Sequence, residues 1–78
     1  MSVNKPTGVH ATNATVNALQ DLRRDYEAIR AQRDAVEPST ARYAVIERRL
    51  AGMRRQAAKL INDLNPNDTA WKRTFGLL

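Results

Sequence analysis

The sequence predicts an all-α fold built around an antiparallel helical hairpin, and three observations favour it. Two long segments place apolar residues at alternating spacings of three and four, which is the pattern of a coiled-coil seam. A short break at residues 37–40 separates the two segments. The chain has 78 residues and no cysteine, so helix packing or association with other chains has to stabilise it.

The first part of the chain shows no periodicity. Residues 1–11 contain Pro6, Gly8 and several small polar side chains, and we expect them to form a flexible polar arm. The helical hairpin is then expected over residues 12–65, with its first helix at about residues 13–37. The seam positions of this helix, all apolar except one arginine, are Leu19, Leu22, Tyr26, Ile29, Arg33 and Val36.

A turn is predicted at residues 37–40, because Pro38 disfavours helical geometry at the residue before it. Either Ser39 or Thr40 can cap the helix that follows. The second helix is expected at about residues 40–64. Its seam positions form an uninterrupted apolar set, namely Tyr43, Ile46, Leu50, Met53, Ala57, Leu60 and Leu64.

The short connection implies that the two helices are antiparallel neighbours. Pairing the seam positions outward from the turn places Val36 opposite Tyr43. In the same register Arg30 faces Glu47 beside the seam. Nearly every layer then holds a large apolar side chain, which supports the predicted pairing.

Residues 66–78 are predicted to form a docking tail. Asp68 follows a turn-forming cluster and can cap one short final helical turn. Aromatic and leucine side chains dominate anchor contacts between proteins, and the tail offers four of them for docking to a partner: Trp71, Phe75, Leu77 and Leu78. Two interpretations remain open, since the tail can plug the open end of its own hairpin or insert into a neighbouring molecule.

The second helix carries most of the positive charge. The chain has a net charge of +5. Within the second helix, Glu47 and Asp63 are the only acidic residues that offset its cations. Arginine suits phosphate and carboxylate groups, so an acidic partner or nucleic acid is expected to contact this set. No aromatic side chain is interleaved with the cations, which leaves base stacking unsupported. The candidate contact residues are Arg42, Arg48, Arg49, Arg54, Arg55 and Lys59.

Self-association is expected on energetic grounds. A single two-helix seam buries few side chains, and their contribution roughly offsets the entropy lost on ordering the chain. Ala44, Ala51 and Ala58 recur every seven residues beside the seam, with Gly52 adjacent. Small residues in a row let a second helix approach closely, although alanine is also simply the strongest helix former.

The residue inventory argues against an enzyme. His10 is the only histidine, cysteine is absent, and the three glycines form no phosphate-binding loop. We therefore expect no catalytic residue, no cofactor and no metal site. No secretory signal or membrane-length apolar run is present, so a soluble intracellular protein, or one held within an assembled particle, is expected without membrane contact.

These observations lead to two functional hypotheses. The first is a non-enzymatic helical assembly or structural protein, a small subunit or accessory component of a larger complex such as a bacteriophage particle. It would act as an oligomer or as a docked subunit, through its tail and hairpin faces. The alternative is a dimeric, basic, helical-hairpin regulator that binds nucleic acid.

Overall fold

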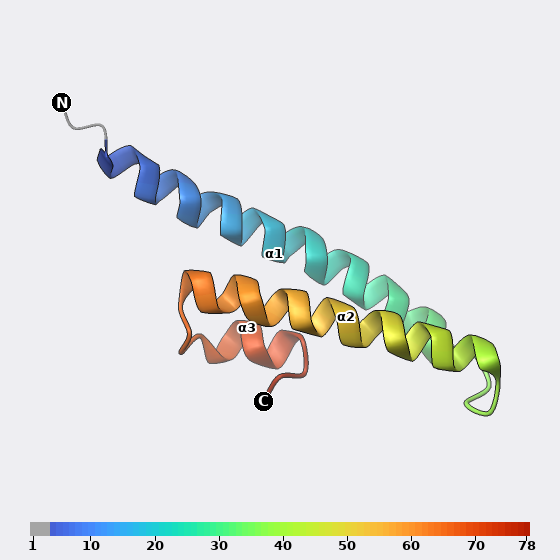
Figure 1. Cartoon of the computed structure of the whole chain (residues 1–78). Coiled ribbons are helices and arrows are strands. Elements are labelled where there is room, and N and C mark those ends of the chain that lie inside the picture. The colour runs from blue at the N-terminus through green and yellow to red at the C-terminus, as the bar shows by residue number, and fades with distance from the viewer. Residues whose placement is uncertain (1–3) are drawn as a thin grey trace.

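The computed structural model describes the backbone of residues 4–78 and the side chains of residues 13–78. It contains three helices, α1 (Asn4–Asp34), α2 (Ala41–Leu64) and α3 (Thr69–Thr74), and no strand within this described part. Helices α1 and α2 pack as an antiparallel hairpin, and α3 turns back along α2 (Figure 1). The prediction of an all-α helical hairpin is confirmed. The molecule is a thin rod of 59 × 19 × 14 Å.

Helix α1 begins earlier than the sequence predicts. It starts at Asn4, so residues 4–11 are helical where the sequence predicts a flexible arm. The remaining arm residues, 1–3, lie outside the described residues. Pro6 falls in the first helical turn, where amide groups have no acceptor within the helix, so the amide hydrogen that proline lacks leaves no helical hydrogen bond unmade. Figure 1 shows this part of α1 continuing beyond the end of α2.

The connection between the long helices is tightened by short-range hydrogen bonds. Helix α1 ends before the predicted position because the amides of Ala35 and Val36 bond to the carbonyls three residues back. Thr40 caps α2 through its hydroxyl, which accepts from the Tyr43 amide at 3.2 Å. The same hydroxyl donates to the Glu37 carbonyl at 2.7 Å. Of the two predicted caps, the structure therefore uses the second.

The core lies along the predicted seam. Among the described side chains, all but two of the buried residues are predicted seam positions, and the exceptions are Ile61, which flanks the seam, and Phe75, which comes from the tail. Four further seam residues are half-buried against this core, namely Val36, Met53, Leu60 and Leu64. The buried set within residues 13–78 is Leu19, Leu22, Tyr26, Ile29, Ile46, Leu50, Ala57, Ile61 and Phe75.

The polar seam position is satisfied by ion pairs. Arg33 donates to Glu47 at 3.0 Å and to Asp34 at 3.2 Å, so Glu47 pairs with Arg33 instead of the predicted Arg30. The long arginine side chain reaches outward from the seam, while Arg30 lies over the Tyr26 ring, 5.9 Å from its centroid. The hydrogen bond to Glu47, and then that to Asp34, raise the pKa of Arg33 above its ordinary value. Like any arginine in a protein, Arg33 stays charged near neutral pH, and the two carboxylates add to this preference.

Truncation of a central seam residue should test the hairpin core. Leu50 is 0% exposed, so Leu50→Ala should lower the free energy of unfolding by about 2–5 kcal/mol through reduced burial and a residual cavity. Val45→Ala on the same helix is the matched control, since Val45 is 58% exposed and its truncation should change stability by less than about 0.5 kcal/mol. Urea unfolding followed by far-ultraviolet circular dichroism measures both. Equal decreases would contradict the core described above.

Candidate docking site at the C-terminal segment

The turn before α3 is built from side-chain caps that the sequence supplies. Helix α2 ends at Leu64, and the Asn65 side-chain oxygen accepts from the Asn67 amide at 3.1 Å. The Asp68 carboxylate then caps α3 by accepting from the Trp71 amide at 3.0 Å. The predicted final helical turn therefore forms, with the predicted residue as its cap.

The end of α3 closes with a glycine motif that reverses the chain. The Leu77 amide donates to the Lys72 carbonyl at 2.7 Å, and the Gly76 amide donates to the Arg73 carbonyl at 3.1 Å. This pair of hydrogen bonds is a Schellman motif, which requires a left-handed residue after the helix. Gly76 has φ of 67° and meets that requirement without a side-chain penalty.

Phe75 anchors the segment in the core of its own chain. Its side chain is 0% exposed. Its ring packs against the Tyr26 ring of α1, with centroids 5.2 Å apart and a tilt of 60°. Trp71 stacks with Phe75, and the centroids of these two rings are 6.2 Å apart. Such aromatic pairs add to the stabilisation from burial alone.

The Tyr26 hydroxyl joins the C-terminal segment to both long helices. It donates to the Phe75 carbonyl at 3.3 Å and accepts from the Arg54 guanidinium of α2 at 3.1 Å. The buried hydroxyl is thus satisfied as donor and as acceptor. Arg54 is half-buried and engaged within the chain. It therefore differs from the other cations that the sequence assigns to a partner contact.

The structure places the four predicted docking residues in different environments. Phe75 is enclosed by its own chain and presents no surface to a partner in this conformation. Trp71 and Leu77 are half-buried against the core, whereas Leu78 is 68% exposed. In this structure the tail folds back on its own hairpin, with Phe75 against Tyr26. Insertion of the tail into a neighbouring molecule stays a prediction.

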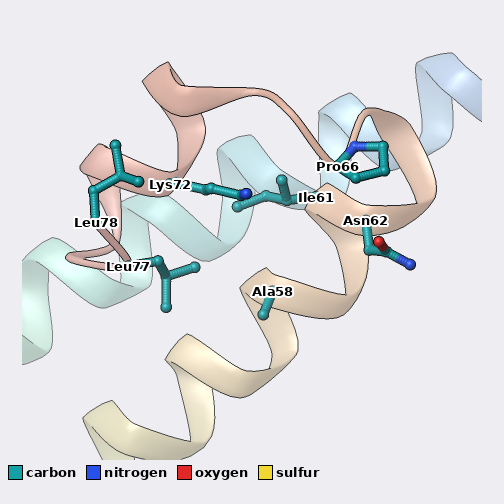
Figure 2. Close-up of a pocket in the computed structure, with 7 residues that line it drawn as sticks. All are labelled: Ala58, Ile61, Asn62, Pro66, Lys72, Leu77 and Leu78. Carbon is teal, nitrogen blue, oxygen red and sulfur yellow. The ribbon is translucent and has the colours of Figure 1, made fainter.

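A groove of about 300 Å³ lies between α2 and the folded C-terminal segment (Figure 2). Figure 2 shows the Lys72 side chain extending from α3 toward Ile61 of α2. Lys72 carries the single charged side chain among the lining residues, and it is half-buried. The lining residues are Ala58, Ile61, Asn62, Pro66, Lys72, Leu77 and Leu78. Sequence reasoning found the two leucines but missed Lys72 and the contribution of Pro66.

The predicted basic set remains largely free on the surface of α2. Every member except Arg54 is exposed. The ion pairs among residues 13–78 involve Arg24 and Arg33 as their cations and none of the α2 cations. The exposed members, which we call the basic face, are Arg42, Arg48, Arg49, Arg55 and Lys59.

Comparison with protein-family models, curated proteins and solved structures finds no match to this chain. Within the described part, none of the three helices combines the length and the apolar character needed to cross a membrane.

Removal of the Tyr26 hydroxyl should weaken the docking of the C-terminal segment. Tyr26→Phe keeps the ring but deletes both hydrogen bonds, and we expect the free energy of unfolding to fall by about 1–3 kcal/mol. Tyr43→Phe is the control, because no hydrogen bond of the Tyr43 hydroxyl is found in the described structure. Urea denaturation of both variants checks this. An unchanged Tyr26→Phe protein would contradict the role of the hydroxyl.

Proposed function

We propose that the protein is a non-enzymatic helical assembly protein, a small subunit or accessory component of a larger complex. The observation that carries this proposal is the groove at the C-terminal segment. There the chain folds back firmly, yet leaves an apolar recess bordered by Leu77 and the exposed Leu78. A small apolar recess of this kind can accept an apolar side chain of a protein partner.

The shape of the molecule supports the same proposal. A rod only 19 × 14 Å in cross-section buries one narrow seam, so contact with a further chain adds burial that the hairpin lacks. Among residues 13–78, the large apolar side chains of Val45 and Leu78 are exposed. We propose a bacteriophage particle as one such complex. We propose self-association, docking into a larger protein assembly, or both.

A second candidate function is nucleic-acid binding by a dimeric helical hairpin. The observation that favours it is the basic face, whose five exposed cations form no ion pair within the described residues. Unpaired arginines on one helix can follow a phosphate backbone without reading base sequence. The arrangement provides charge but no stacking aromatic, which favours contact with the backbone alone.

The mass of the full chain in solution should separate these proposals. We expect light scattering on a size-exclusion column to give a discrete mass of at least two chains, with an absorbance ratio free of nucleic acid. We expect an oligomer because contact between two rods buries apolar surface that one hairpin leaves in solvent. A concentration-independent monomer would contradict self-association. Co-purified nucleic acid that high salt releases would favour the second candidate instead.

The nucleic-acid candidate has its own test in fluorescence anisotropy with a labelled DNA duplex. If it is correct, affinity should fall steeply between about 50 and 200 mM salt. The Arg48→Ala, Arg55→Ala double variant should make the plot of log affinity against log salt concentration less steep. The slope should change by about 1 for each phosphate that is no longer neutralised. Arg24→Ala is the control, because Arg24 lies on α1 and pairs with Asp21. Equal effects of the two variants, or no binding at low salt, would exclude the basic face as a nucleic-acid site.

A further inference from the structure

Three arginines from the two long helices gather around Tyr26. Arg23 precedes Tyr26 by three residues and Arg30 follows it by four, so both share its side of α1. The Arg30 guanidinium lies 5.9 Å from the centre of the Tyr26 ring. Arg54 reaches the same tyrosine from α2 and donates to its hydroxyl at 3.1 Å. The contact with Tyr26 therefore brings cations of both helices to one side of the hairpin.

The described carboxylates leave this group of arginines without a counter-ion. Among residues 13–78, none of the three forms an ion pair, and the terminal carboxylate of Leu78 forms none either. Glu27 lies between Arg23 and Arg30 on α1, but its side chain is exposed and pairs with neither. Guanidinium groups that meet across a helical seam repel each other. A bound anion would remove that repulsion.

Arg54 is the fixed member of the group. It is half-buried, and its single hydrogen bond within the described residues goes to the neutral Tyr26 hydroxyl. A guanidinium has several N–H donors, so this bond leaves most of them for another acceptor. Because the hydroxyl already holds the side chain in place, a ligand does not bear the full entropy cost of ordering it. A fixed cation with open donors is suited to binding an anion.

The charge and the donors of the group favour phosphate over carboxylate. A carboxylate has one negative charge, and a single guanidinium fork satisfies both of its oxygens. A phosphate group carries up to two negative charges and more acceptor oxygens. Arg23 and Arg54 come from different helices, so they can bind different oxygens of one phosphate.

We propose that Arg23 and Arg54 bind a phosphate group between α1 and α2, with Arg30 adding positive charge beside it. The site is separate from the basic face, whose members all lie on α2, and it does not depend on the proposed assembly function. Two sources supply this chemistry. One is free phosphate or a phosphomonoester, and the other is the diester backbone of a nucleic acid.

NMR of the full isotope-labelled chain at constant ionic strength tests the site. The probes are inorganic phosphate, acetate, and a thymidine trinucleotide that has diester linkages but no terminal phosphate. We expect phosphate to shift the side-chain N–H signals of Arg23 and Arg54 saturably, with an affinity about fivefold higher than that of acetate. Equal affinities for phosphate and acetate, or shifts confined to the basic face, would overturn the proposal.

The trinucleotide identifies the source of the phosphate. If it shifts the same arginine signals saturably, the site accepts a diester and the backbone of a nucleic acid is the source. If phosphate binds and the trinucleotide does not, the ligand is free phosphate or a phosphomonoester. Both results support the site, whereas binding of neither probe contradicts it.

Neighbouring residues of α1 supply matched variants. Arg23→Gln removes one guanidinium and leaves the Tyr26 hydrogen bonds in place, so phosphate affinity should fall about tenfold. Arg24→Gln is the control, because Arg24 pairs with Asp21 at 3.3 Å, and its affinity should not change. Glu27→Gln removes a competing carboxylate and should raise the affinity about twofold. Equal losses in the two arginine variants, or an unchanged Arg23→Gln protein, would overturn the site.

Arg54→Lys separates charge from geometry at the fixed arginine. Lysine keeps the positive charge and a donor for the Tyr26 hydroxyl, but it lacks the guanidinium fork. We expect phosphate affinity about fivefold lower than that of the unaltered chain, with the helical circular dichroism retained. Full phosphate affinity in Arg54→Lys would contradict the assignment of this residue.

Discussion

A hairpin of two helices can bury only one stripe of each, and this constraint shapes the rest of the molecule. The seam supplies most of the core, but many of the described residues of each long helix remain exposed. Phe75, at the end of α3, adds to this core because its ring packs against the Tyr26 ring. The resulting third contact is small, and it depends on a single aromatic anchor held by a glycine turn.

The hydrogen bonds of the Tyr26 hydroxyl set the orientation of the C-terminal segment relative to the two long helices. Ring packing alone would permit several orientations of α3, because aromatic contacts tolerate a range of tilts. The hydrogen bonds from Arg54 and to the Phe75 carbonyl fix the end of the segment relative to both long helices. The groove beside α2 follows from that fixed placement, and so does the position of Lys72 within it.

The sequence predicted what depends on local spacing. The three-and-four periodicity indicated the seam, Pro38 and Thr40 indicated the turn, and Asp68 indicated the start of α3. It could not predict the bonds of Tyr26, whose partners lie 28 and 49 residues away and follow no repeat. Gly76 after a short helix was an available indication of the reversed chain. The groove forms only where α2 and the folded C-terminal segment come together, so no local sequence pattern predicts it.

The placement of Phe75 also has a consequence for the order of events as the chain folds. Its docking surface combines Tyr26 with α2, so that surface does not exist until the two long helices have come together. The hairpin closes across a short connection, whereas the tail must close a loop of 49 residues back to Tyr26. The C-terminal segment therefore packs only after the hairpin has closed, and it is the last of the three helical elements to reach its place.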